Sequence, residues 1–210
     1  KKIIVQNTDD LNLCLKNRLC DENELVLIKG SGIKTKLFEH IDLSSKENII
    51  LFPARLLKDK GFNEFIRAAI TLNKKYKNWK FFLAGTDDYE SPNSISRQEV
   101  NQLRKLPFLK FLGHTKNIDD YFKRASIVCL PSYREGMPKA LLEAQAAGCP
   151  VVTTDTVGCR ESILDNQTGY LVPLYNSSEI AKKLEKLILD NHLREKMGKK
   201  MVLRSEKMRK

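Results

Sequence analysis

The chain has 210 residues, of which 41% are hydrophobic and 30% are charged, a composition that predicts a folded core rather than disorder. Its formal net charge is +11, but residues 181–210 hold eleven Lys or Arg against four acids and so account for +7 of that charge. The rest of the chain is close to balanced, which argues against a nucleic-acid-binding surface wrapped around the domain. We therefore expect no nucleic-acid partner and a basic helix at the C-terminal end.

Metal-binding and disulfide-forming residues are few and scattered. Five cysteines show no CxxC spacing, which predicts free thiols in a reducing cytoplasm. Three histidines lie far apart in the sequence, so no histidine-based metal site is expected. No apolar run approaches the roughly 20 residues that a membrane-spanning helix needs. These features predict a cytoplasmic protein.

The first 47 residues are predicted to hold a strand, a helix and a second apolar run before an irregular linker. In chain order they hold a strand at 3–6, a helix from a cap at Asp9 or Asp10 to about Arg18, and an apolar run at 25–28. The chain opens directly on the strand-like run KKIIVQ, which predicts that it is a segment of a longer protein. Residues 30–32 form a Gly-Ser-Gly turn, and the polar residues 34–47 are interpreted as a linker.

From residue 48 onward, apolar runs alternate with helical patterns. The predicted strands are 48–53, 79–84, 108–112, 127–130, 151–152 and 170–172. The predicted helices are 62–76, a segment that ends near 106, 117–124, 138–147, 159–165, 177–190 and 193–208. The strands are continuously apolar, which predicts an α/β fold with a Rossmann-like parallel sheet and helices on both faces. Ligands of such sheets bind beyond the carboxyl ends of the strands.

One stretch, PSYREGMPKALLEAQAAGCPVV at 131–152, combines a strand end, a polar turn and a helix start. Pro138 suits the first helical position, and the free N–H groups that follow it suit an anion. Glu143 lies roughly 7 Å further along the helix axis, at 1.5 Å per residue, and its carboxylate suits the hydroxyls of a sugar. The alternative is that Glu143, in a largely apolar helix, pairs with a buried Lys or Arg.

The loop 54–61 carries Arg55, Lys58 and Lys60 directly after a strand. Arginine and lysine at this edge of a parallel sheet suit a diphosphate, whereas the alternative is a solvated charged loop. Other motifs are absent: the sequence has no GxxxxGK[ST], no GxGxxG after a strand and no GxSxG. Asp87 and Asp88 form either a metal-binding pair or, the favoured interpretation, part of a polar loop.

Taken together, residues 55–61, 81–85, 111–113 and 135–143 resemble the C-terminal donor-binding domain of family-four (group 1) glycosyltransferases of the GT-B fold. The resemblance covers about residues 45–190, in the right order and spacing. It implies retaining transfer of a hexose-type sugar from a nucleotide diphosphate sugar, with UDP favoured, and no required metal or other cofactor. The acceptor it implies is a glycan or a lipid-linked molecule of surface polysaccharide synthesis.

The resemblance also implies a role for each candidate residue. It assigns Arg55, Lys60, Lys139 and Ala140 to the donor diphosphate, Glu135, Gly136, Met137 and Pro138 to the donor sugar, Glu143 to the ribose, and Gly113 and His114 to the base. Glu135 is thereby the candidate catalytic residue. Cations and a helix start near the diphosphate would stabilise its growing negative charge more in the transition state than in the ground state.

The sequence departs from the family pattern at two turns. Gly158-Cys159 stands where the family has paired glycines, and Gly85 is followed by Thr86. Both departures bear on how the donor sugar fits.

The resemblance divides the chain into three parts. These are residues 1–29, a remnant of the N-terminal acceptor domain and crossover, residues 30–192, the donor-binding domain, and residues 193–210, a basic C-terminal helix. The rest of the N-terminal domain is therefore an expected partner, and the isolated fragment is expected to be inactive. The basic helix either docks that domain, lies in solvent or contacts the inner face of a membrane. A non-hydrolysing nucleotide-sugar epimerase and a non-catalytic nucleotide-sugar-binding module are the alternative functions.

Overall fold

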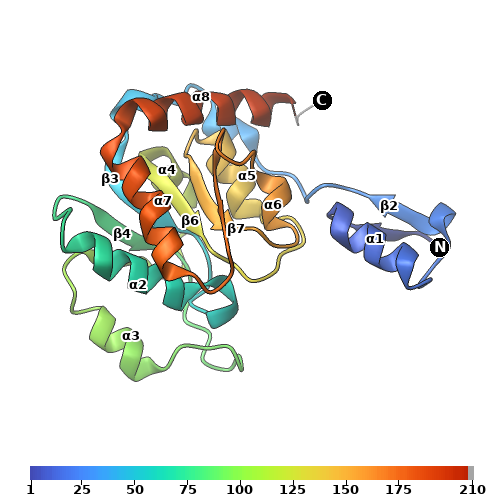
Figure 1. Cartoon of the computed structure of the whole chain (residues 1–210), viewed down its shortest axis with the longest axis horizontal. Coiled ribbons are helices and arrows are strands. Elements are labelled where there is room, and N and C mark those ends of the chain that lie inside the picture. Colours follow the sequence, from blue (N-terminus) through green and yellow to red (C-terminus); the bar gives the residue numbers. More distant parts are fainter. Residues whose placement is uncertain (208–210) are drawn as a thin grey trace.

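The computed structural model describes residues 1–207 and centres on a six-stranded parallel sheet (Figure 1). The strands are β3 (Glu47–Phe52), β4 (Lys80–Leu83), β5 (Leu109–Phe111), β6 (Ala125–Leu130), β7 (Val151–Thr154) and β8 (Gly169–Val172). Their order is β5-β4-β3-β6-β7-β8, and every neighbouring pair is parallel. The predicted parallel sheet is confirmed.

The strand order has a direct consequence for ligand binding. The chain builds outward from β3 through β4 to β5, returns to β6 on the other side of β3, and then continues to β8. This is the doubly wound order in which loops on opposite sides of the reversal open a crevice at the carboxyl edge. The crevice lies between β3 and β6, so the loops after these two strands, 53–61 and 131–138, flank it.

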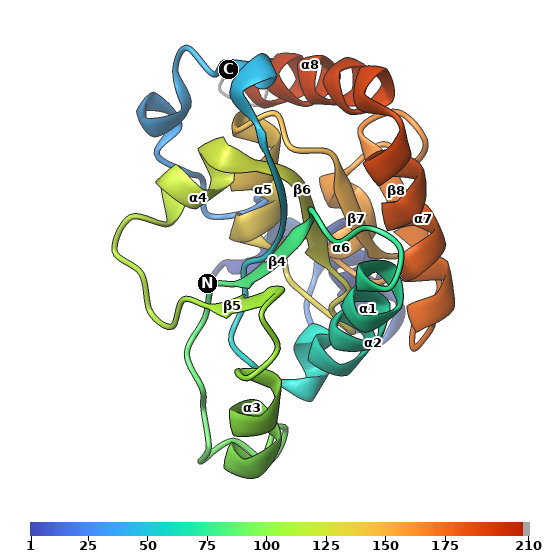
Figure 2. The same ribbon diagram turned by 90° about the vertical axis from the view of Figure 1, so that its left-hand side faces the viewer.

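Helices cover both faces of the sheet. In chain order they are α2 (Phe62–Asn73), α3 (Arg97–Leu103), α4 (Ile118–Arg124), α5 (Lys139–Ala146), α6 (Cys159–Ser162), α7 (Ser177–Leu189) and α8 (Asn191–Lys207). Helices α2 and α7 pack together on one face, and α4 and α5 cover the other (Figure 2). Because both faces are covered, the strands bury almost every side chain, and all six residues of β6 are buried.

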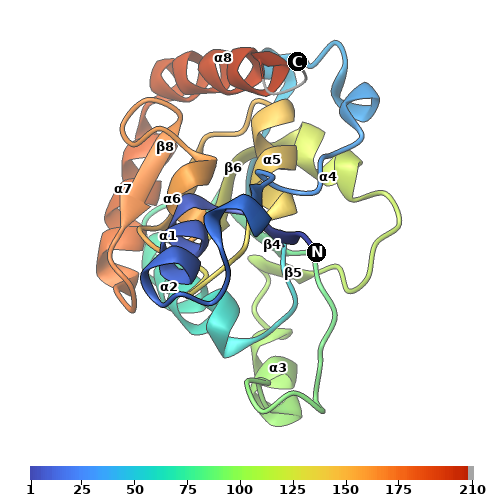
Figure 3. The same cartoon turned by 90° about the vertical axis from the view of Figure 1, so that its right-hand side faces the viewer.

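The N-terminal residues form a small unit of their own. Strand β1 (Ile3–Val5) pairs in parallel with β2 (Leu25–Leu27), and α1 (Thr8–Lys16) connects them. The prediction that Asp9 or Asp10 caps this helix is wrong, since Asn7 is the cap and accepts a hydrogen bond from the Asp10 N–H. An Asn oxygen serves as well as a carboxylate at this position, which sequence inspection overlooked. Figures 1 and 3 place the unit beside the α6 end of the main sheet.

Residues 34–47 pack against helices α4, α5 and α8 instead of forming a free linker. They contain the short 3-10 helices η2 (Thr35–Phe38) and η3 (Leu43–Ser45). Phe38 is buried and contacts Phe122 edge to face, and Lys46 donates hydrogen bonds to the carbonyls of Phe122 and Ala147. Phe38, the partly buried Ile41 and Lys46 thus tie this polar segment to the domain.

The predicted C-terminal helix is present as α8 and packs along α5. Met197 and Met201 are buried, and a Cβ atom on Gly198 would lie 2.5 Å from the carbonyl oxygen of Gly148. Gly198 therefore allows the helix to pass close to the turn that ends α5. Within residues 1–207, none of the helices combines the length and the apolar character required to cross a bilayer.

Candidate functional site

Two charged side chains from opposite sides of the crevice meet at its centre. Lys60 ends η4 (Lys58–Lys60) in the loop after β3, and Glu135 lies in the loop after β6. The Lys60 Nζ atom lies 2.8 Å from Glu135 Oε1, and the two side chains are only 20% and 16% exposed. Because both side chains are mostly buried, few water molecules contact the pair. An incoming anion therefore competes directly with the Glu135 carboxylate for Lys60.

The buried hydroxyl of Ser132 contacts the carboxylate of this ion pair. Ser132 is fully buried, and its Oγ lies 2.8 Å from Glu135 Oε1 and 3.2 Å from the carbonyl oxygen of Asp59. The Tyr133 N–H also donates to that carbonyl, at 2.8 Å. The loops after β3 and β6 are therefore hydrogen-bonded to each other directly beneath the charged groups. This fixes where the Glu135 carboxylate sits relative to Lys60.

Glycines make this close approach of loops feasible. Gly61 has φ of +74°, and a Cβ atom there would lie 2.1 Å from the carbonyl oxygen of Pro131. Gly158 has φ of +76°, and its Cβ would lie 2.4 Å from the carbonyl oxygens of Glu135 and Gly136. Both positions combine a left-handed backbone with a contact that excludes any side chain.

Helix α5 points its start at the crevice. It begins at Lys139 with Pro138 as the N-cap, one residue later than predicted, because Pro138 has extended backbone angles. The first N–H groups with acceptors are those of Leu141 and Leu142, which bond to the Pro138 carbonyl. In the described part of the chain, the N–H groups of Lys139 and Ala140 have no backbone acceptor. These two donors, with the helix dipole, form an anion-binding end.

Glu143 lies one turn further along α5 and is largely buried, with 15% of its side chain exposed. Burial raises the pKa of its carboxyl, and the nearby Lys139 opposes that shift. Lys139 Nζ lies 3.4 Å from Glu143 Oε1, so Glu143 pairs with an exposed lysine of its own helix and not with the buried Lys or Arg of the alternative interpretation. The Lys139 side chain is 59% exposed, so it can move into solvent when hydroxyl donors bind to the Glu143 carboxylate.

The other predicted diphosphate residue, Arg55, is engaged elsewhere. Its Nη1 atom lies 2.6 Å from Asp88 Oδ2, in the loop after β4, and the arginine side chain is 55% exposed. Asp87 in the same loop accepts a hydrogen bond from Tyr89 and lies 3.5 Å from Arg104. Arg55 is therefore at the predicted sheet edge but in a separate ion pair from Lys60.

Of the predicted donor-sugar residues, Glu135 reaches Lys60, whereas Met137 and Pro138 are buried in the domain. Met137 is buried, and its sulfur accepts a hydrogen bond from Ser162 Oγ at 3.3 Å. Pro138 is buried as well. The Gly136 carbonyl accepts a hydrogen bond from the side chain of Asn7, at 2.9 Å. After Glu135, this loop can therefore offer a ligand its backbone groups but not the side chains of Met137 and Pro138.

The predicted base-binding residues lie at the end of β5, the edge strand two places from β3. Gly113 has φ of +65° and nothing within 4 Å of a Cβ position, and His114 is exposed. The structure gives them no contact with Lys60 or Glu135. Their loop leads into α4, which packs against α5, the helix that carries Glu143.

Sequence inspection missed two residues of this site. Ser132 stands three positions before Glu135, a spacing that carries no signal until the turn folds back. Asn7 lies 129 positions away from its partner Gly136. In the sequence it is recognisable only as a possible helix cap, which gives no hint of this contact.

Comparison with known proteins places this arrangement among sugar transferases. The family model described as Glycosyl transferases group 1 matches residues 33–202. The capsular polysaccharide biosynthesis glycosyltransferase CapM of Staphylococcus aureus is 28% identical over 196 residues, which cover 88% of this chain and 51% of CapM. An N,N'-diacetylbacillosaminyl-diphospho-undecaprenol alpha-1,3-N-acetylgalactosaminyltransferase of Campylobacter jejuni is 31% identical over 198 residues, covering 88% of this chain and 50% of that enzyme.

Solved structures agree on the fold. The Anabaena protein HepE, crystallised with UDP and glucose, superposes with a TM-score of 0.84 at 18% identity, over 98% of this chain and 58% of HepE. The C-terminal domain of a glycosyl transferase group 1 family protein, LpcC of Francisella tularensis, gives a TM-score of 0.72 at 30% identity, over 85% of this chain and 99% of that domain. The chain spans about half the length of the curated relatives it matches. Its fold is that of the C-terminal domain in the two-domain GT-B architecture.

Proposed function

The chain belongs to the group 1 glycosyl transferases, and from that premise we propose that it is the donor-binding half of an enzyme that transfers a hexose-type sugar from UDP, with retention and without a metal. The observation that carries this proposal is the Lys60–Glu135 pair in the crevice between β3 and β6. It brings a cation and a carboxylate from two separate loops to the point where this fold binds nucleotides.

The proposed division of labour follows from charge and reach. The diphosphate lies against Lys60 and the free N–H groups at the start of α5, which receive the negative charge that develops as the sugar leaves. Arg55 joins them by exchanging Asp88 for a phosphate oxygen. Glu143 accepts hydrogen bonds from the ribose hydroxyls, and the loop at Gly113 and His114 receives the base.

Glu135 lies on the sugar side of the diphosphate in this arrangement. Its carboxylate, held by Ser132, orients the donor sugar and stabilises positive charge at the reacting carbon. The N–H groups of Gly136 and Met137, which have no protein acceptor within residues 1–207, add hydrogen-bond donors for the sugar.

We assign the acceptor site to the half of the enzyme that lies outside residues 30–207. The relative in Campylobacter jejuni has a name that describes a lipid-linked acceptor, and CapM serves capsular polysaccharide synthesis. By analogy, we propose a glycan or lipid-linked acceptor at the cytoplasmic face of a membrane. Without the opposite half, the donor-binding domain is expected to bind nucleotide sugars but not to transfer them.

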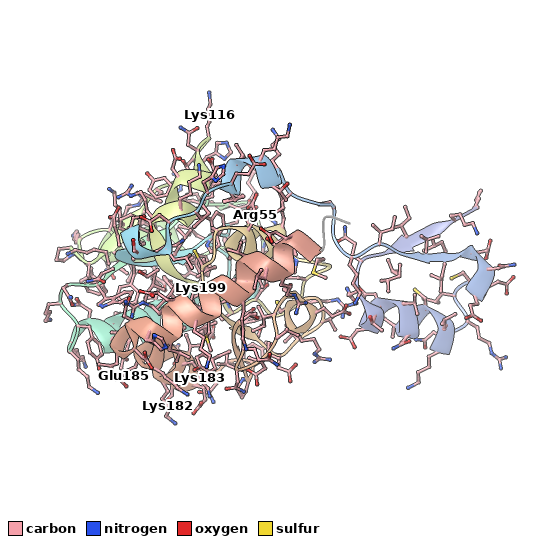
Figure 4. The ribbon with its side chains drawn as sticks, turned by 90° about the horizontal axis from the view of Figure 1, so that it is seen from above. Arg55, Lys116, Lys182, Lys183, Glu185 and Lys199 are labelled. Carbon is pink, nitrogen blue, oxygen red and sulfur yellow. The ribbon has the colours of Figure 1, made fainter. Side chains whose placement is uncertain are left out.

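The basic C-terminal part offers a surface for such a membrane. Figure 4 shows Lys182 and Lys183 projecting from one edge of the molecule, Lys199 on α8, and Lys116 at the opposite edge. Lys199 and Lys200 are exposed on α8, and Leu203 on the same helix is 58% exposed. A helix with exposed lysines and an exposed leucine suits peripheral contact with anionic lipid. Binding to vesicles that contain anionic lipid but not to neutral vesicles is the expected result in a sedimentation assay.

The experiment that tests the proposed function is a calorimetric titration of this chain with UDP, GDP and ADP, each alone and with a sugar attached. Saturable binding with a preference for uridine is expected, and the variant Glu143→Gln should lose most of it. If none of the three nucleotides binds, the donor-site proposal is wrong. Conversion of UDP-N-acetylglucosamine to its epimer by the chain would favour the epimerase alternative instead.

A further inference from the structure

The N-terminal unit touches the main body at the donor-sugar loop. Four charged residues from the two sides pair there: Arg134 with Asp10, and Arg160 with Asp9 at 3.2 Å. These pairs are partly exposed at their arginines, so solvent and salt weaken them. These ion pairs hold the N-terminal unit next to the loop, but they do not set the orientation of any peptide group in the loop.

Asn7 is different because it is completely buried at this contact. Its Oδ1 atom accepts the Asp10 N–H at 2.7 Å and thereby caps α1. Its Nδ2 group donates to Asp10 Oδ2 at 2.7 Å and to the Gly136 carbonyl at 2.9 Å. Every polar atom of the side chain is therefore used, and the cap decides which end of the amide faces Gly136.

The bond to Gly136 constrains the backbone next to Glu135. In a trans peptide, the carbonyl of one residue and the N–H of the next point in opposite directions. Holding the Gly136 carbonyl toward Asn7 thus turns the Met137 N–H away from the N-terminal unit. That N–H has no protein acceptor within residues 1–207. It is a donor held in place for something the chain itself does not supply.

The surrounding contacts leave the peptide little freedom. A Cβ atom on Gly136 would lie 2.4 Å from Gln6 Oε1, and one on Gly158 would lie 2.4 Å from the Gly136 carbonyl oxygen. The peptide is therefore enclosed between the end of β1 and the start of α6. Gly158, with φ of +76° and backbone oxygens at this distance, is the position that admits no side chain.

We propose that Asn7 is a positioning residue of the donor site: it holds the Gly136–Met137 peptide so that the Met137 N–H faces the donor sugar, and it makes sugar recognition depend on the N-terminal unit. This inference rests on the proposed function, since it assigns the sugar to that loop. Asn7 lies outside residues 33–202, the range that the family model matches. It contacts neither the diphosphate residue Lys60 nor the ribose residue Glu143 in the contacts described above.

The variant Asn7→Ser separates capping from positioning. Serine caps a helix as well as asparagine does, but its hydroxyl is too short to reach the Gly136 carbonyl as well. Asn17→Ser is the matched control, since Asn17 bonds to Leu13 at the other end of α1 and lies away from the loop. Calorimetric titrations with UDP and with UDP-glucose and UDP-N-acetylgalactosamine then compare the two variants with the unmodified chain.

For Asn7→Ser, we expect the dissociation constant of whichever UDP-sugar the unmodified chain binds to rise about tenfold, as the loss of one oriented hydrogen bond predicts, while that of UDP changes less than about twofold. Asn17→Ser should change neither. Equal weakening of UDP and UDP-sugar, or no change in either, would overturn the inference. If the unmodified chain binds no uridine nucleotide, the proposed function itself has failed.

Hydrogen exchange of the ligand-free chain gives a second readout that needs no ligand. Asn7→Ser should speed exchange of the Glu135 amide, which donates to the Val157 carbonyl at 3.1 Å beside the Gly136–Met137 peptide, and leave the strands of the main sheet unchanged. Exchange of the Glu135 amide that matches the unmodified chain would overturn the inference, whatever the titrations give. Acceleration that extends through the main sheet would also overturn it, because Asn7 would then support the whole fold rather than this one peptide.

Discussion

Replacing Glu135 with Gln is expected to tighten the binding of UDP, although Glu135 is the candidate catalytic residue. The reason is that Lys60 is held by the carboxylate in the free site, at 2.8 Å. Glutamine keeps the shape of the side chain and its contact with Ser132 Oγ, but it removes the charge that competes with the diphosphate. UDP lacks the sugar that Glu135 is proposed to orient, so it loses nothing in exchange.

The size of the effect follows from the geometry of the pair. Two unit charges 2.8 Å apart attract each other by about 1.5 kcal/mol in a water-like dielectric and by about 6 kcal/mol at an effective dielectric of 20. Exposures of 20% and 16% place the pair between these limits, and the desolvation of both groups offsets most of the attraction. A net gain of about 1 kcal/mol in the binding free energy of UDP predicts roughly fivefold tighter binding.

Isothermal titration of UDP at low salt measures this directly. Glu143→Gln is the matched control, because it is the same substitution in the same crevice but removes a proposed ribose acceptor, and it should weaken binding. A Glu135→Gln variant that binds UDP as the unmodified chain does, or more weakly, would refute the view that Lys60 is shared between Glu135 and the diphosphate.

The remaining predictions concern stability and pH. Burial raises the pKa of Glu143, so its ionisation costs folding free energy above the ordinary Glu range; Glu143→Gln should therefore raise the melting temperature at pH 8 by about 1–3 °C, and this gain should vanish in acid. UDP affinity should also fall as the pH drops through that raised pKa, because a protonated Glu143 carboxyl accepts hydrogen bonds from the ribose hydroxyls less well. A pH-independent affinity between pH 8 and pH 4 would contradict the ribose assignment. Gly61→Ala should lower the melting temperature by about 6 °C or more, because it adds a clash with the Pro131 carbonyl to the cost of a left-handed alanine. Gly32 has φ of +75° but open space around it, so Gly32→Ala should lower the melting temperature by no more than about 4 °C. Arg55→Ala should weaken UDP binding by about threefold to tenfold, and an unchanged affinity would show that Arg55 stays with Asp88.

The sheet was predictable because its signals are local. Each strand is a short apolar run followed by a glycine or a polar turn, as at Gly85 and Gly113, and the continuous burial of β6 follows from its all-apolar sequence after Ser126. Glu143 of the candidate site also stands out in the sequence, because a lone acid is conspicuous in an apolar helix. Local patterns of this kind need no knowledge of which strands are neighbours.

The pairing of side chains was not predictable, because it depends on strand order and on distant segments. Lys60 meets Glu135 only because β6 lies beside β3, which no local pattern of residues encodes. Arg55, five positions before Lys60, bonds instead to Asp88 in the loop after β4. Asn7 reaches Gly136 through a contact between two separately folded units, and its sequence signal is fully explained by capping α1.

A crystal structure of this chain with UDP bound tests the central claim most directly. We expect the diphosphate within hydrogen-bond distance of Lys60 and of the N–H groups of Lys139 and Ala140, with the ribose hydroxyls at Glu143. A nucleotide bound away from the crevice between β3 and β6, or one that leaves Lys60 paired with Glu135 and contacts neither the start of α5 nor Glu143, would contradict it.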